Sequence, residues 1–175
     1  MNFSKASRLV VLIAALTTLA QAQKVETTVD HSYDLSKAKS YALAPLSKTN
    51  PLNKLPEVEY QVRTELTNEL QKAGLKEDKE HPDLLVSYST DEKEFKNSYS
   101  TAQTGVTAGN QSWTEDYIIR TLSLTFFDTK TNKSAWQSTT TERTSPGPME
   151  DYVPKLMKKT IEAFAKDAHR KMGKG

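Results

Sequence analysis

Cysteine is absent from this 175-residue sequence, and its absence excludes several kinds of chemistry. A chain without thiols has no disulfide framework, no thiolate nucleophile and no thiolate metal site. It also lacks the acylated cysteine through which bacterial lipoproteins are anchored. We therefore expect no lipid anchor.

Long hydrophobic runs are scarce as well. One apolar run covers residues 9–16 and continues weakly to Ala20, and no second run of this kind follows. A membrane-spanning helix needs about 20 consecutive apolar residues. The mature chain is therefore expected to have no transmembrane span.

The short apolar run has the surroundings of an export signal. Lys5 and Arg8 precede it, and small residues occupy the two positions that a signal peptidase reads, the second of them Ala22. This arrangement predicts a secretory signal peptide over residues 1–22, cleaved between Ala22 and Gln23, with a retained signal anchor as the alternative. The mature protein is then periplasmic or secreted.

Charge of one sign is lacking once the signal is removed. The whole chain has a formal net charge of +2, and residues 1–22 contain Lys5 and Arg8 but no acidic residue, so the mature chain is neutral overall. A neutral chain with interspersed charges has no field that attracts nucleic acid. We predict no nucleic-acid partner.

Only six glycines are present, and none belongs to a Gly-rich phosphate loop or a Gly-x-Ser-x-Gly nucleophile elbow. Serine and threonine are abundant, but none of them has a histidine and an acid in a recognisable catalytic context. No motif specifies a reaction. The sequence therefore predicts that the protein is not an enzyme and uses no cofactor.

Asp30, His31 and Asp34 form the only cluster of potential metal ligands. They lie within one short, turn-rich bridge, whereas a zinc site needs three or four ligands that converge on the ion. We interpret them as solvated turn residues and predict no metal site.

Two segments have the apolar spacing of amphipathic helices. The first begins near Pro56 and ends before Gly74, which supplies a C-terminal stop. The second follows the chain break at residues 146–148, with Asp151 as its cap and Pro154 in its first turn. The apolar positions are Val58, Val62, Leu66, Leu70 and Ala73 in the first segment and Val153, Met157, Ile161, Phe164, Ala168 and Met172 in the second.

Strand patterns flank these helices. Apolar alternation predicts strands at residues 24–29, 40–44 and 83–88, the last of which continues to Phe95. It also predicts a β-hairpin over residues 118–143 around which the rest of the chain is organised. Two helices and about five strands in this order predict a single α+β domain over residues 23–175. Its sheet is expected to be antiparallel or mixed, with both helices on one face.

The turn of the hairpin sets an expected register. A connection closed by Asp128 and Lys133 suits Asn132 at a left-handed position. Counting back from this turn places Trp136 on the same face as Phe127, at one end of an exposed Ser and Thr surface, because paired residues share a face. Phe127 and Trp136 are therefore candidate binding residues, with a simply solvated face as the alternative. The opposite, more apolar set is expected under the helices: Leu122, Leu124 and Phe126.

Residues 97–116 are rich in Ser, Thr, Gly, Asn and Gln and show no sustained apolar period. We interpret them as a long, flexible loop in which limited proteolysis cuts first. Tyr99, Trp113 and Tyr117 in and beside this loop are candidate binding residues, because aromatic rings among small polar residues stack on sugars or pack on proteins. The alternative is that Trp113 and Tyr117 begin the next strand.

Four segments are similar in sequence to a known family: residues 34–41, 72–75, 82–88 and 122–136. Their order and spacing resemble the bacterial domain-of-unknown-function family forty-one thirty-six over nearly the whole mature chain. The resemblance implies a small exported envelope protein with an α+β fold, and many members are lipoproteins. It implies no activity and no catalytic residues. This chain departs from the family by lacking the lipoprotein cysteine and by having Asn132 where Gly is usual.

Two functions remain open. The first is a non-catalytic binding or structural module that contacts an envelope protein or a cell-wall glycan through the long loop or an open sheet face. The second is a hydrolase that acts on an envelope substrate. A deep pocket in which Asp30, His31 or Asp34 meets a Ser or Thr from another segment would favour the hydrolase, and a shallow polar surface would favour binding.

Overall fold

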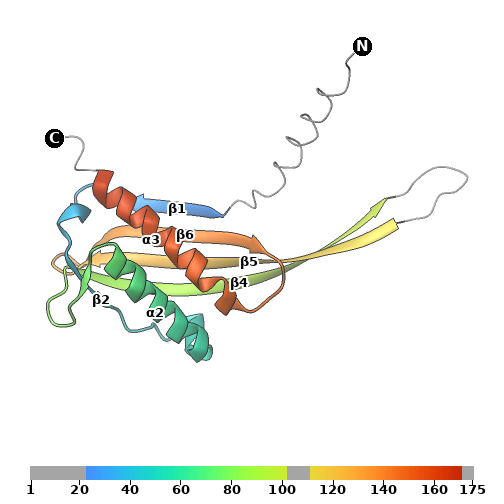
Figure 1. The fold of residues 1–175 in the computed structure, drawn as a ribbon, viewed down its shortest axis with the longest axis horizontal. Helices are drawn as coiled ribbons and strands as arrows, with labels where there is room; N and C mark the ends of the chain where they lie inside the picture. The colour runs from blue at the N-terminus through green and yellow to red at the C-terminus, as the bar shows by residue number, and fades with distance from the viewer. Residues whose placement is uncertain (1–22, 102–110, 171–175) are drawn as a thin grey trace, which may run out of the picture.

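The computed structural model describes residues 23–101 and 111–170, with side chains described for residues 23–98 and 114–170. One mixed sheet carries both long helices on the same face (Figure 1). The six strands lie in the order β1-β6-β5-β4-β2-β3. The strands are β1 (Lys24–Val29), β2 (Ser40–Leu43), β3 (Lys76–Glu77), β4 (Leu84–Thr101), β5 (Gln111–Asp128) and β6 (Ser134–Thr144). The helices are α2 (Pro56–Lys72) and α3 (Val153–Arg170), with short 3-10 turns η1 (Leu35–Lys37), η2 (Pro51–Lys54) and η3 (Met149–Asp151).

This architecture confirms the predicted single α+β domain. The pairs β1–β6, β6–β5 and β5–β4 are antiparallel, whereas β2 runs parallel to both β3 and β4. The sixth strand, β3, is two residues long and was not predicted. It forms because the chain leaves α2 through Gly74, whose φ of 90° turns the next residues back toward β2.

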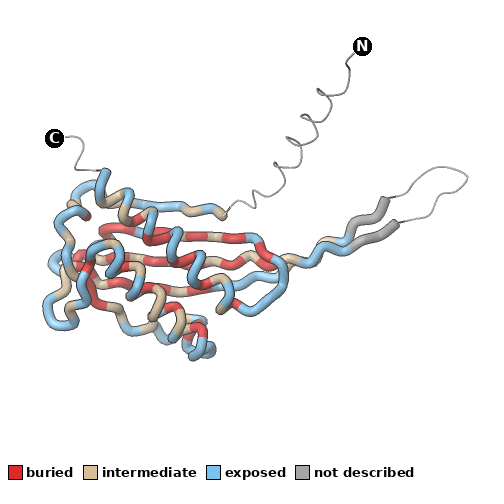
Figure 2. Tube along the Cα trace, in the orientation of Figure 1, coloured by how far each residue is buried: buried red, intermediate tan, exposed pale blue. Residues whose placement is uncertain are grey.

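The core lies between the sheet and the two helices, as the buried positions in Figure 2 show. From α2 it takes the four aliphatic side chains predicted by their spacing: Val58, Val62, Leu66 and Leu70. Each buried aliphatic side chain contributes about 1.5–3 kcal/mol to folding, far more than the surface ion pairs of the helix. The apolar face of the hairpin is also confirmed as core: Leu122, Leu124 and Phe126 are at most 1% exposed.

The turn of the β5–β6 hairpin has the predicted closure. The backbone N–H of Asp128 donates to the carbonyl oxygen of Lys133 at 2.9 Å. Asn132 has a φ of 55°, which is the left-handed conformation expected of it. Within the turn, the Asp128 carboxylate accepts a hydrogen bond from the Thr131 hydroxyl at 2.6 Å.

The predicted position of Trp136 is wrong. Phe127 pairs with Ser134 as expected, but Phe126 pairs with Trp136, so Ala135 is an extra residue in a β-bulge. A one-residue shift exchanges the faces of all later residues of the strand. Trp136 is therefore 0% exposed and contacts the rings of Phe126 and Phe164, with centroid distances of 5.1 and 5.4 Å.

The predicted loop over residues 97–116 is also wrong in its bounds. Strand β4 continues to Thr101 and β5 begins at Gln111, and residues 95–101 pair with residues 111–117 in an extended two-stranded ribbon. Figure 1 shows the ribbon projecting beyond the helices. No helix among the described residues covers it, so its pairing does not require a sustained apolar period in the sequence. Residues 102–110 lie outside the described part.

The predicted signal peptide, residues 1–22, lies outside the described residues. Within the described segments, no helix combines the length and apolar character needed to cross a membrane.

Candidate binding face

Asp30, His31 and Asp34 lie in the bridge between β1 and β2, where the two aspartates build turns. Asp30 Oδ1 accepts hydrogen bonds from the backbone N–H and the hydroxyl of Ser32, at 2.8 and 2.7 Å. Asp34 Oδ1 accepts the same pair from Ser36, and the hydroxyl bond is the main cause of the lowered pKa of Asp34. Among the described residues, no group of three or more His, Cys, Asp or Glu is arranged to hold a metal ion.

The fold does bring Asp30 near a threonine of another segment. Asp30, Tyr33 and Thr131 line a depression of about 110 Å³ beside the hairpin turn, and His31 is not part of its lining. Ligand pockets usually enclose about 300–1,000 Å³. The Thr131 hydroxyl is held by Asp128, and burial, followed by the charges of nearby aspartates, raises the pKa of Tyr33 to about 12. The depression is therefore smaller than a usual ligand pocket.

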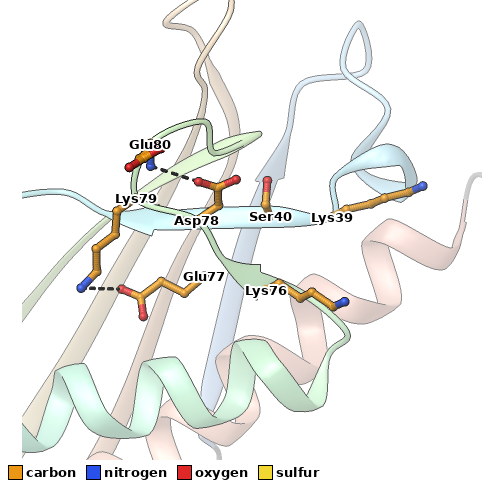
Figure 3. A pocket seen from close by; sticks show the side chains of 7 residues that line it. All are labelled: Lys39, Ser40, Lys76, Glu77, Asp78, Lys79 and Glu80. Atoms are coloured by element: carbon orange, nitrogen blue, oxygen red, sulfur yellow. Dashed lines mark hydrogen bonds and ion pairs between the residues drawn. The ribbon is translucent and has the colours of Figure 1, made fainter.

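A wider cavity of about 570 Å³ lies at the β2–β3 edge of the sheet (Figure 3). Three of its charged side chains have local partners. Lys79 Nζ lies 3.6 Å from Glu77 Oε1, and the Asp78 carboxylate accepts the backbone N–H groups of His81 and Glu80, which lower its pKa. Figure 3 shows the Lys39 and Lys76 side chains extending away from Asp78 rather than toward it. No set of groups converges on a common point in this cavity.

The sheet face opposite the helices has a different character. On this face β4, β5 and β6 align in cross-strand rows of small hydroxyl and amide side chains. We call this surface the hydroxyl face, and its members are Ser87, Ser89, Thr121, Ser123, Thr125, Gln137, Thr139 and Thr141. None of these eight residues is charged, although 26% of the chain is charged; on the same face the exposed Asp91 lies opposite Thr121, at the end toward the ribbon. Loss of charged residues is the main compositional mark of the centre of a protein interface.

A row of aromatic and basic side chains borders the hydroxyl face where the ribbon begins. The rings of Phe95 and Tyr117 stack with a centroid distance of 5.0 Å and an interplanar angle of 6°. The guanidinium of Arg143 lies 3.8 Å from the Tyr117 centroid, and Lys93 Nζ lies 5.4 Å from that of Phe95. Arg143 also forms an ion pair with Glu115. We call Lys93, Phe95, Tyr117 and Arg143 the aromatic row.

The structure places the binding residues predicted from the sequence in different parts of the fold. Tyr117 lies in the aromatic row, and Phe127 is half-buried at the opposite end of the hydroxyl face, where it pairs with Leu85. Trp136 belongs to the core and is removed from the candidates. Tyr99 pairs with Trp113 in the backbone of the ribbon, and the side chains of both lie outside the described part.

Phe95, Lys93 and Arg143 were not singled out from the sequence. Lys93 and Phe95 could have been noticed, because they alternate at the end of a predicted strand and alternate residues share a face. Placing Arg143 beside Tyr117 requires the register of β6, which depends on the bulge at Ala135. These contacts could not be found from residue spacing alone.

A buried polar cluster on the helix side of the sheet was also missed. The Arg120 side chain is 0% exposed, donates to Glu92 Oε1 at 2.7 Å and stacks on Tyr152 with 3.9 Å to the ring centroid. It also donates to the Thr144 hydroxyl and to the carbonyl oxygens of Ser145 and Gly147. Arg120 therefore holds the chain after β6 against the sheet.

Comparisons with known proteins agree with this fold. The family described as Domain of unknown function (DUF4136) matches residues 25–164. No curated protein matches the sequence.

Two solved structures are similar at low sequence identity. A PDZ domain protein from Parabacteroides distasonis ATCC 8503 has a TM-score of 0.54 and 18% identity, and the match covers 79% of this chain but only 35% of that one. The PelC dodecamer from Paraburkholderia phytofirmans has a TM-score of 0.50 and 11% identity, with 82% of this chain and 97% of that chain covered. Identities this low indicate a shared fold only.

Proposed function

We propose that this chain, which belongs to the family Domain of unknown function (DUF4136), is an exported envelope protein that acts as a non-catalytic binding module. Its binding surface is the hydroxyl face together with the aromatic row. The observation that carries the proposal is the contrast between the two sheet faces: one is covered by both helices, and the other is uncovered, uncharged at its centre and bordered by half-buried rings.

The chemistry of the aromatic row favours a protein partner over a glycan. A sugar stacks on an open ring face. In the aromatic row, Tyr117 is stacked against Phe95 and also covered by the Arg143 guanidinium. Arginine and aromatic residues around an uncharged patch are instead the composition enriched in protein–protein interfaces.

The non-catalytic role is supported by Asp78 in the wider cavity and by Asp34 in the bridge between β1 and β2. Each carboxylate accepts hydrogen bonds from its own turn, and these bonds lower its pKa. A general acid or base at neutral pH needs a carboxyl pKa raised toward 7, so these carboxylates are poorly suited to such a role.

Export is supported by the signal-peptide pattern and by the family. N-terminal sequencing of the exported protein is expected to begin at Gln23. A chain that begins at Met1 in the membrane fraction would overturn both the signal peptide and the location.

Site-specific photo-cross-linking in living cells tests the binding face. A photoreactive phenylalanine analogue at Ser123, in the centre of the hydroxyl face, is expected to yield a discrete adduct with one protein. The same analogue at Glu162, an exposed position on α3, is the matched control and is expected to yield none. The adduct from Ser123 should decrease when Arg143→Glu reverses the charge in the aromatic row.

Two results would contradict this proposal. Equal adducts from both positions would mean that the hydroxyl face is not the partner surface. Co-sedimentation of the purified protein with peptidoglycan sacculi, abolished by Ser123→Arg, would mean that the partner is a glycan and not a protein.

A further inference from the structure

Strand β4 has a long unpaired edge. Strand β2 pairs with β4 only at residues 84–86, and no strand among the described residues lies beside the same edge farther along β4. The last contacts on that side are the Ala44 N–H bound to the Val86 carbonyl at 2.8 Å and the Asn50 side-chain amide bound to the Tyr88 carbonyl at 2.8 Å. The edge from Ser89 onward extends along the ribbon (Figure 1).

The backbone polarity of this edge follows from those two contacts. The carbonyl groups of Val86 and Tyr88 point away from β5, and backbone groups alternate in direction along a strand. The even-numbered residues of β4 beyond Tyr88 therefore direct both N–H and C=O to the outer edge. These residues are Thr90, Glu92, Glu94, Lys96, Ser98 and Ser100. Such a row is a template for one more strand.

The charges along the edge select one partner and one register. Glu92, Lys93, Glu94 and Lys96 are all exposed. In an antiparallel pairing of β4 with a second β4, directly opposite residues share a face, so the two-fold axis passes through a residue position. An axis at Glu94 sets Glu94 opposite Glu94 between two pairs of Glu92 with Lys96, and an axis at Lys96 sets Lys96 opposite Lys96. An axis at Phe95 sets Glu94 opposite Lys96 on both sides and sets no like charges opposite one another.

The hydrogen-bond pattern agrees with the axis at Phe95. Glu94 and Lys96 are even-numbered, so they form a hydrogen-bonded pair in this register. Phe95 directs its backbone groups toward β5, so the two Phe95 residues form a non-hydrogen-bonded pair, whose side chains approach most closely. The half-buried Phe95 ring would then meet its copy and extend the aromatic stack with Tyr117 across the two molecules.

We propose that the partner of the β4 edge is a second copy of this chain, joined in an antiparallel β4–β4 ladder with its two-fold axis at Phe95. Most soluble oligomers are symmetric, and a two-fold interface uses the same surface on both copies. The ladder continues the sheet from one molecule into the other. Because paired residues share a face, the two hydroxyl faces lie on the same side of the joined sheet.

Single cysteines test the register directly, because the natural chain contains no cysteine. A non-hydrogen-bonded pair separates its Cα atoms by about 4.5 Å, within the usual disulfide range. The Phe95→Cys variant of the full-length chain, exported and oxidised, is therefore expected to form a disulfide-linked dimer. Lys93→Cys is the control on the same face: the two copies would be offset by four residues, or about 13 Å, which a disulfide cannot span.

Charge exchange tests the pairing without removing Phe95. Glu94→Lys and Lys96→Glu each set like charges opposite one another and are expected to raise the dimer dissociation constant about tenfold, as cross-strand ion pairs become repulsive. The double variant restores opposite charges and is expected to dimerise like the natural chain. An equal mixture of the two single variants should form mixed dimers. Glu162→Lys on α3 changes the net charge equally and should leave dimerisation unchanged.

Light scattering and sedimentation velocity give the masses. A chain that stays monomeric at its highest soluble concentration overturns the proposal. Cross-linking of Lys93→Cys as readily as Phe95→Cys, or single charge reversals that behave like Glu162→Lys, also overturns it. If Phe95→Cys fails to fold, the charge variants still test whether the β4–β4 ladder forms.

Discussion

At the scale of single residues, Trp136 is the clearest case of a side chain whose role depends on one backbone irregularity. The bulge at Ala135 turns its indole into the core, where it stacks edge-on against Phe126 and Phe164 and its Nε1–H donates to Asp167 at 3.0 Å. We predict that Trp136→Ala lowers the free energy of unfolding by about 3–5 kcal/mol, since a large ring is removed from a packed core. Urea unfolding followed by circular dichroism measures this difference.

The control for Trp136 is Phe127→Ala. Phe127 is half-buried on the opposite face of the sheet, so its loss should cost about 1 kcal/mol. Equal losses from the two variants would show that Trp136 is not a core residue.

Arg120 is the second residue whose burial decides its contribution. Its guanidinium is fully buried, and it binds Glu92 and the carbonyl oxygens that follow β6. Arg120→Met keeps much of the side-chain bulk but removes the hydrogen bonds to Glu92, to the buried Thr144 hydroxyl and to those carbonyl groups. We predict a loss of about 3 kcal/mol in the free energy of unfolding, measured by urea titration.

The matched variant for Arg120 is Arg143→Met. Arg143 also pairs with a glutamate, Glu115, but its side chain is 46% exposed. Exposed ion pairs contribute about 0–1 kcal/mol, so this variant should have nearly the stability of the natural chain. A larger effect at Arg143 than at Arg120 would contradict the assignment of the buried cluster.

At the scale of elements, Asp83 joins the start of β4 to the start of β2. Its Oδ2 accepts the backbone N–H groups of Lys39 and Ser40, at 2.9 and 3.1 Å, and the Lys39 bond is the main cause of its lowered pKa. The folded-state pKa lies below the ordinary value of 3.8, so the stabilisation by the carboxylate is complete above pH 3.8 and is lost as the pH falls through the folded-state pKa.

The pH dependence of Asp83→Asn tests this link. We predict that the natural chain is the more stable one at neutral pH and that its advantage shrinks below about pH 4. Urea unfolding of both proteins between neutral and acid pH measures the difference. An advantage that is constant over this range would show that the charge of Asp83 does not stabilise the β2–β4 pair.

At the scale of the whole molecule, the ribbon is separate from the core. Residues 95–101 and 111–117 pair only with each other, and the first fully developed core position of β5 is Ile118, at 7% exposure. We predict that replacing residues 96–116 by Asn-Gly, which closes the Phe95 and Tyr117 pair with a two-residue turn, changes the free energy of unfolding by about 1 kcal/mol or less.

Chemical unfolding of the shortened chain provides the measurement. A single cooperative transition near that of the natural chain is expected, because no described core side chain is removed. Loss of cooperative unfolding would mean that the ribbon is part of the folding core. The same variant lacks most of the β4 edge, so it should also be monomeric if the β4–β4 ladder is correct.

Local chemistry was enough to predict α2, α3, the principal strands of the body and the turn at Asn132. Helix α2 has its apolar residues at the helical interval, a proline in its first turn and Gly74 at its end, and each of these acts within a few residues. The register next to the turn also depends only on nearby residues: counting from Asp128 correctly predicts that Phe127 pairs with Ser134.

Tertiary structure decided the positions that distinguish the two faces. The bulge at Ala135 forms because burying the Trp136 ring against Phe126 and Phe164 is worth more than one regular pair in the ladder, and no local pattern marks that exchange. The ribbon was not predicted, because strands that no helix covers can pair through their backbones without a regular spacing of apolar residues in the sequence. Arg120 was not singled out from the sequence, because Glu92, Tyr152 and the carbonyl groups after β6, which enclose it, come from other segments of the chain. Residue spacing records what each segment can bury, whereas the partners against which it is buried come from distant parts of the chain.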